Sequence, residues 1–201
     1  MFNRMQNSAK RMQTLIQDLL TYSGTNTSEH NFETKDLNQI MAEVQEDLRE
    51  ELKEKHATIE ANQLCDAEII PFQFRQLMHN LIGNSLKFSK PGHAPHVLIK
   101  SEIANGLALR NQNLSPEKTY CHITVSDNGI GFEQQYSQKI FEVFQRLHSK
   151  YEYSGTGIGL SIVKKIVENH NGFITATGEV GAGATFDIYI PHFERSKTAK
   201  A

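Results

Sequence analysis

The stretch Tyr153–Ser161 reads YSGTGIGLS, with glycines at three alternate positions and a helix-like apolar run after them. Glycines at this spacing let a backbone approach a phosphate, a dinucleotide or a neighbouring strand closely. The common phosphate loops fit poorly, because a dinucleotide-binding loop follows a strand directly and a Walker A loop ends in Gly-Lys-Ser/Thr. Here the preceding residues do not alternate as a strand does, and Leu160 and Ser161 follow the glycines. Taken alone, this stretch leaves the ligand open.

Two further glycine clusters lie on either side of this stretch, Asp127–Phe132 (DNGIGF) and Gly181–Phe186 (GAGATF). Three clusters in one domain predict a site at which the backbone meets a ligand repeatedly. Asp127 ends a predicted strand and shares the parity of Ile123 and Val125, so its carboxylate belongs to the apolar face. One interpretation is a turn residue, which is common before glycine. The other is an acceptor for a ligand amino group, such as N6 of adenine.

The predicted helix after Pro71 carries a polar stripe at steps of four, four and three: Gln76, Asn80, Asn84 and Lys87. Residues at these steps share one helix face, and asparagine is a poor residue for the middle of a helix. Amide oxygens suit Mg²⁺, and a lysine can meet a phosphate as a point charge. A plain solvent-exposed face is the alternative, and it fits either asparagine alone better than the whole stripe.

The composition excludes several classes of function. The chain has 201 residues, 38% of them hydrophobic, and a formal net charge of −2 with both signs mixed. This charge pattern predicts no nucleic-acid partner and no polybasic membrane anchor. No apolar run has the length that crosses a bilayer, and the N-terminus lacks the pattern of a signal peptide. Cys65 and Cys121 have no metal-binding spacing, and we expect two free thiols in a reducing cytoplasm.

The chain divides into segments of different pattern. Residues 1–22 have apolar residues at heptad spacing, which predicts a bundle helix; residues 23–35 read as a polar linker. Helices are expected from Asp36, over residues 71–88, 133–146 and 160–170, and strands over residues 56–62, 96–102, 119–127, 173–177 and 184–190. This order predicts an α+β fold in which helices cover one face of a mixed sheet. Residues 192–201 are expected to be a frayed tail.

The motifs and their order along the chain resemble the catalytic ATP-binding domain of sensor histidine kinases, which has the Bergerat or GHKL fold. Phytochrome-type and hybrid kinases are especially similar. The five motifs are Phe74–Phe88 (N box), Asp127–Phe132 (G1 box), Phe141–Lys150 (F box), Gly155–Ser161 (G2 box) and Gly181–Phe186 (G3 box). The resemblance implies a Bergerat-type α/β sandwich over residues 36–191. It also implies that residues 1–22 are an isolated bundle helix, the second helix of a dimerisation and histidine-phosphotransfer domain.

The resemblance assigns roles to individual residues. Asp127 would bind the adenine amino group while Gly131 lets the base approach, and Asn80 would hold Mg²⁺ near Asn84 and Lys87. The implied ATP-binding residues are Asn80, Asn84, Lys87, Asp127, Gly129, Gly131, Phe144, Arg146, Gly155, Thr156, Gly157, Ile158, Gly159, Leu160 and Thr185.

Three of these assignments concern the glycine loop and its surroundings. The G2 glycines would start a helix at Leu160 whose free N–H groups and dipole attract phosphate. Phe141 and Phe144 would anchor a mobile lid over Glu133–Ser154, and Thr185 would line the base pocket.

One departure from the family concerns the phosphoacceptor. The family's phosphoacceptor His precedes an acidic residue, and none of the nine histidines here is followed by Asp or Glu. We therefore expect part of a longer kinase, which binds ATP and Mg²⁺ but does not autophosphorylate. Its expected partners are an upstream phosphoacceptor domain, a response-regulator receiver domain and, in the full-length protein, a second copy in a homodimer. The expected location is the cytoplasm, whether or not the parent kinase is anchored in a membrane.

Two alternatives stay open. A gyrase-type or MutL-type ATPase of the same superfamily hydrolyses ATP with a Glu one turn before the metal-binding Asn. That position is Gln76 here, and an amide cannot act as a general base. The other alternative is a nucleotide-free module for dimerisation or docking, although Asn80, Asp127 and all the glycines are present.

Overall fold

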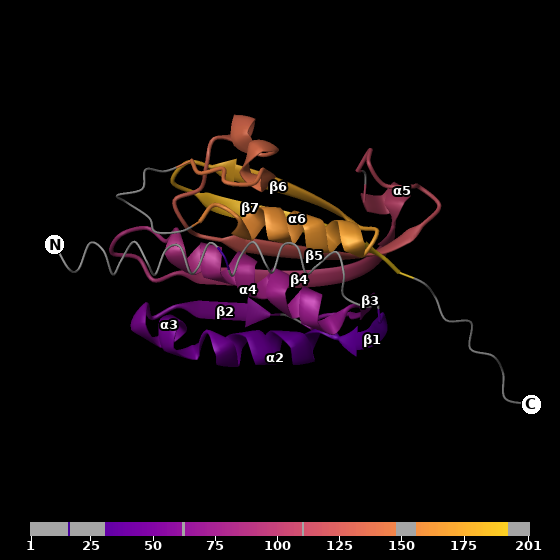
Figure 1. Cartoon of the computed structure of the whole chain (residues 1–201), viewed down its shortest axis with the longest axis horizontal. Coiled ribbons are helices and arrows are strands. Elements are labelled where there is room, and N and C mark those ends of the chain that lie inside the picture. Colours follow the sequence, from indigo (N-terminus) through magenta and orange to yellow (C-terminus); the bar gives the residue numbers. More distant parts are fainter. Residues whose placement is uncertain (1–15, 17–30, 62, 110, 148–155, 193–201) are drawn as a thin grey trace, which may run out of the picture.

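A five-stranded mixed sheet forms the centre of the computed structural model, which describes residues 16, 31–61, 63–109, 111–147 and 156–192 (Figure 1). The strand order is β2 (Thr58–Ala61), β4 (His96–Asn105), β5 (Thr119–Asp127), β7 (Gly183–Pro191) and β6 (Phe173–Glu179). β2 pairs in parallel with β4, and the other neighbours are antiparallel. The mixed sheet predicted from the sequence is confirmed.

Three helices supply the other half of the core: α2 (Leu37–Asp47), α4 (Pro71–Lys87) and α6 (Gly159–Asn169). Their buried faces share one cluster with alternate strand residues, among them Val97, Ile99, Ile123, Val125, Phe186 and Ile188. Figure 1 shows α4 and α6 side by side, and the two helices are in contact. Because side chains alternate across a strand, the opposite face of the sheet carries the polar residues of β5 and β7.

A second, two-stranded sheet was absent from the sequence prediction. β1 (Glu33–Asp36) pairs antiparallel with β3 (Asp66–Ile69), and β1 includes residues that the sequence pattern places in the linker. Asp36 ends β1 and also caps α2, because its carboxylate accepts the N–H of Asn38 at 2.8 Å. The helix expected from Asp36 is α2, which ends at Asp47, and α3 (Arg49–Glu54) follows after Leu48.

The helix predicted over residues 133–146 is wrong. The structure has two single 3₁₀ turns there, η1 (Gln134–Tyr136) and η2 (Lys139–Phe141), and irregular backbone after them. Tertiary contacts override the local preference in this segment. The amide of Gln134 bonds to two backbone groups of β6, the N–H of Gly178 and the C=O of Ala176, and Phe141 is buried against Phe186.

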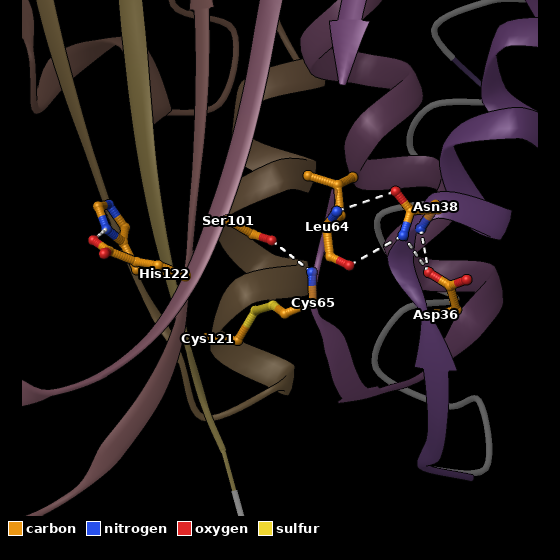
Figure 2. Close-up of a disulfide and its surroundings, with 8 residues drawn as sticks. Asp36, Asn38, Leu64, Cys65, Ser101, Cys121 and His122 are labelled. Carbon is orange, nitrogen blue, oxygen red and sulfur yellow. Dashed lines mark hydrogen bonds and ion pairs between the residues drawn. A yellow bond between two sulfur atoms is a disulfide. The ribbon is translucent and has the colours of Figure 1, made fainter. Parts of the chain in front are cut away.

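The expectation of free thiols is also wrong, because Cys65 and Cys121 form a disulfide (Figure 2). Cys65 lies just before β3, and its N–H donates to the hydroxyl of Ser101 on β4 at 2.7 Å. Cys121 lies on β5, the neighbour of β4, and faces the core. The two residues are 56 apart in sequence, so only the pairing of β4 with β5 and the path of the chain over it bring them together.

Some predictions fall outside the described residues. They include the bundle helix over residues 1–22, most of the linker and most of the tail. The domain boundaries therefore stay predictions. None of the helices within the described ranges is both long and apolar enough to traverse a bilayer.

Candidate functional site

Asp127 stands where three of the sequence motifs meet. Its Oδ1 atom accepts the N–H of Gly129 at 2.8 Å and the N–H of Ala184 at 3.2 Å. Its Oδ2 atom accepts the hydroxyl of Ser85 at 3.1 Å. A carboxylate has about four acceptor positions, so three donors orient Asp127 and leave it able to accept one more. Its position at the inward edge of the sheet agrees with the predicted parity.

Backbone hydrogen bonds hold the loop after Asp127 in place. The N–H of Ile130 donates to the C=O of Phe88 at the end of α4, and the C=O of Ile130 accepts the N–H of Gly181. Gly131 has a φ of +65°, and a Cβ atom built there would overlap the C=O of Glu179. A side chain at this position would therefore push the loop away from the turn between β6 and β7.

Asn128 bonds the same loop to the start of β4 and to the segment just before it. Its Oδ1 atom accepts the N–H of His96 at 2.9 Å, and its Nδ2 atom donates to the C=O of Ala94 at 3.1 Å. Neither Asn128 nor Ser85 was predicted from the sequence as a site residue. Their partners are more than thirty residues away in the chain, so spacing carries no signal for either.

The polar stripe of α4 faces the start of α6. A Cβ atom built on Gly159 would lie 3.8 Å from Oδ1 of Asn80, so the amide of Asn80 meets the first turn of α6. Within the described part of the chain, Gln76 Oε1 and Asn80 Nδ2 are the buried side-chain atoms that lack a hydrogen-bond partner. Buried polar atoms are rarely left unpaired, so these two atoms indicate a place for a polar ligand.

The first turn of α6 presents backbone N–H donors that no side chain in the described part of the chain caps. Ile158 precedes the helix, is fully buried, and no described side chain caps the helix N-terminus. Gly157 has a φ of +78°, and its C=O accepts the N–H of Phe144 at 2.9 Å. The first N–H groups of a helix lack partners within the helix, and the helix dipole adds positive potential. This turn can bind an anion beside Asn80.

Two cations lie close enough to each other for their charges to interact, Lys87 at the end of α4 and Arg146. Burial lowers the pKa of Lys87, and the positive charge of Arg146 lowers that pKa further. The ammonium of Lys87 also stacks 4.5 Å above the ring of Phe88. Lys87 and Lys90 line a cavity of about 580 Å³, and none of the described residues that line it is acidic. Like charges brought close in a half-buried place favour an anionic ligand.

The structure brings Asp127 together with Gly129 and Asn80 together with Gly159. Three other predictions differ from the structure or lie outside the described residues. Thr185 and Phe186 lie on opposite faces of the sheet, and the hydroxyl of Thr185 contacts that of Ser126 at 2.9 Å. Thr185 therefore does not line a pocket beside Asp127. Phe141 is buried, whereas the side chain of Phe144, the other predicted lid anchor, is 59% exposed. Gly155 and residues 148–154 of the predicted lid lie outside the described residues.

The chain is similar in sequence to known proteins. The model of the family described as "Histidine kinase-, DNA gyrase B-, and HSP90-like ATPase" matches residues 70–194. Cyanobacterial phytochrome A from Nostoc sp. strain PCC 7120 is 38% identical over 180 residues, which make up 90% of this chain and 22% of that protein. The chain thus spans less than a quarter of that relative.

Two solved structures share the fold. The crystal structure of full-length ShkA in complex with AMPPNP has a TM-score of 0.72 at 23% identity, over 94% of this chain and 38% of that one. The crystal structure of the histidine kinase ThkA in complex with the response regulator TrrA has a TM-score of 0.67 at 21% identity, over 96% and 51% respectively. At these identities the likeness establishes the fold alone.

Proposed function

Because this chain belongs to the family of histidine kinase-, DNA gyrase B- and HSP90-like ATPases, we propose that residues 36–191 are the ATP-binding catalytic part of a two-component sensor histidine kinase. The observation that carries the proposal is the amide of Asn80, which faces the first turn of α6 with a buried atom unpaired. A nucleotide that lies between Asp127 and this turn would have its adenine amino group on the carboxylate. Its phosphates would then lie among the free N–H groups of α6.

The residues present fit a divalent cation bound together with the nucleotide. An amide oxygen is a suitable Mg²⁺ ligand, and Mg²⁺ is usually held by one or two protein oxygens plus substrate phosphates. Asn80 would supply that oxygen, with Asn84 one turn further along the same face. When bound, the cation neutralises charge on the phosphates and helps to orient them. Lys87 and Arg146 would contribute further positive charge from α4 and the lid segment.

The proposed reaction is transfer of the γ-phosphate to a histidine on another segment of the parent kinase. Such transfer depends mainly on positioning and electrostatic stabilisation. Gln76 supports transfer over hydrolysis, because an amide cannot remove a proton from an attacking water. The proposal includes a cytoplasmic location, a homodimeric parent and a response-regulator receiver domain as the next phosphate acceptor. ThkA crystallised with its response regulator is a precedent for that partner.

Nucleotide binding tests the proposal directly. We expect Mg-AMPPNP to bind in the micromolar to millimolar range, measured by isothermal titration calorimetry. Asp127→Asn should weaken binding by a factor of about 10 to 150, because it replaces a charge-assisted hydrogen bond to the adenine amino group, which is worth about 1.5–3 kcal/mol. Asp66→Asn is the matched control, since Asp66 is exposed at the start of β3. Equal affinity of wild type and Asp127→Asn would refute the adenine assignment.

A second experiment separates transfer from hydrolysis. Wild-type protein incubated with Mg-ATP and the phosphoacceptor domain of its parent should form an acid-labile phosphohistidine on that domain. Gln76→Glu places a general base one turn before Asn80 and should raise ATP hydrolysis. Vigorous hydrolysis by the wild type without phosphohistidine would favour the gyrase-type alternative. Absence of any nucleotide binding would favour a docking module.

A further inference from the structure

Hydrogen bonds join α4 and α6 at the end away from the proposed phosphate site. His170 ends α6 and is 2% exposed. Its Nε2 atom accepts the N–H of Ile70, the residue immediately before α4, at 2.9 Å. Its Nδ1 atom lies 2.7 Å from the C=O of Ile166. Because Nε2 accepts, Nδ1 must carry the proton and donate it to that carbonyl, so this network assigns a single neutral tautomer.

A second bond joins the same ends of the two helices. The Nδ2 atom of Asn169 donates to Oε1 of Gln73 at 3.1 Å. Gln73 is 1% exposed in the first turn of α4. The rings of Phe32 and Phe74 meet the ring of His170 edge-on, with centroids 5.4 and 6.2 Å away. This group, His170 with Asn169 and their partners on α4, is called the helix clamp below.

The helix clamp and the proposed phosphate site lie at opposite ends of α6. Gly159 begins the helix beside Asn80, and Asn169 ends it beside Gln73. The two helices therefore run antiparallel. With a rise of about 1.5 Å per residue, the clamp lies roughly 15 Å from the first turn of α6. Neither His170 nor Asn169 can touch a nucleotide that occupies that turn.

Apolar packing and hydrogen bonds constrain a helix pair differently. Burial of apolar area is non-directional, so the apolar faces of α4 and α6 tolerate small sliding and rotation. Hydrogen bonds are directional and lose strength steeply as their angle departs from linear. A bond from a ring nitrogen of α6 to the backbone before α4 therefore specifies one register. A shift of about 1 Å in such positioning can cost a factor of about 100 in rate.

We propose that His170, together with Asn169, is a positioning residue for the phosphate end of the nucleotide site. The helix clamp sets the register of α6 against α4 and so sets how Asn80 meets the first turn of α6. The proposal rests on the proposed function, since it concerns ATP bound between these helices. The adenine end depends on Asp127, whose hydrogen bonds come from Ser85, Gly129 and Ala184.

The proposal is tested by comparing a ligand that has only the adenosine end with one that also has the phosphates. His170→Phe keeps an aromatic ring between Phe32 and Phe74 but removes both ring nitrogens, whereas His170→Gln keeps a side-chain acceptor for Ile70. Affinities for adenosine and for Mg-AMPPNP are measured by calorimetry, at a temperature where urea unfolding shows each variant to be folded. We expect His170→Phe to bind adenosine within about twofold of wild type but Mg-AMPPNP about tenfold more weakly, the order of one charge-assisted hydrogen bond.

Further variants complete the experiment. His170→Gln should recover most of the Mg-AMPPNP affinity, and Glu168→Gln, an exposed change in the same turn, should leave both affinities unchanged. If His170→Phe does not fold, Asn169→Ala removes one clamp bond and should lower Mg-AMPPNP affinity alone. Equal losses for both ligands, or no loss for either, would overturn the proposal. Failure of the wild type to bind either ligand would instead overturn the proposed function, and the positioning role with it.

Discussion

Replacement of Gly131 by alanine tests whether the loop after Asp127 requires close backbone contact. Gly131 has a φ of +65°, and its Cβ would overlap the C=O of Glu179 and lie 2.7 Å from the C=O of Gly183. Gly181→Ala is the matched control, because Gly181 has a φ of +79° but a Cβ there would meet no described atom within 4 Å. Both variants carry the backbone cost of a left-handed residue, and Gly131→Ala alone adds overlap with two carbonyls.

The expected free energies of unfolding follow from these two terms. A left-handed alanine costs about 1–2 kcal/mol, and an overpacked position adds about 1–3 kcal/mol. Gly131→Ala should therefore lower the free energy of unfolding by about 2–5 kcal/mol, and Gly181→Ala by about 1–2 kcal/mol. Urea unfolding followed by circular dichroism measures both. Equal losses in the two variants would show that the loop yields to the added methyl and would refute the close-contact reasoning.

Two further predictions concern the sheet and the disulfide. Burial lowers the pKa of His122, but hydrogen bonds to Asp187 and Glu102 outweigh it and raise the pKa above its ordinary value. The stabilisation by protonated His122 should thus be fully present below about pH 6.5. It should be lost as the pH rises through the folded-state pKa. A midpoint of urea unfolding that is unchanged between pH 5.5 and 8.5 would contradict this prediction. Reduction of Cys65–Cys121 should lower the free energy of unfolding by about 4 kcal/mol, because the disulfide closes a loop across 56 residues. Thermal melts identical with and without a reductant would disprove that.

Local pattern was sufficient for the elements with strong periodicity. The alternation of β5 and the polar stripe of α4 are visible in the sequence, and the structure confirms both elements as well as the strand predicted over residues 184–190. The parity of Asp127 was predicted by the same reasoning. These features depend on residues within one element, where a period of 2 or 3.6 reports the buried face directly.

Features that depend on distant partners could not be predicted in this way. β1 and β3 are four residues each, and each is stabilised by its pairing with the other. The segment 133–146 has helix-forming residues, but bonds to β6 and burial of Phe141 decide its course. Thr185 was expected beside the adenine because of the family resemblance. Its own alternation with Phe186 already places it on the other face of the sheet.

The bonds of Asn128 have a consequence for the chemical ageing of this protein. An Asn-Gly pair in a flexible chain deamidates when the glycine nitrogen attacks the asparagine side chain, and asparagine is among the thermolabile residues. Here the two amide atoms of Asn128 are bound to Ala94 and to His96, the first residue of β4, and the N–H of Gly129 donates to Asp127. Because the Gly129 nitrogen and the Asn128 amide each bond to other groups, the fold protects the Asn128–Gly129 pair from deamidation. Deamidation would begin in unfolded molecules. Isoaspartate at position 128 would then disrupt the loop that orients Asp127.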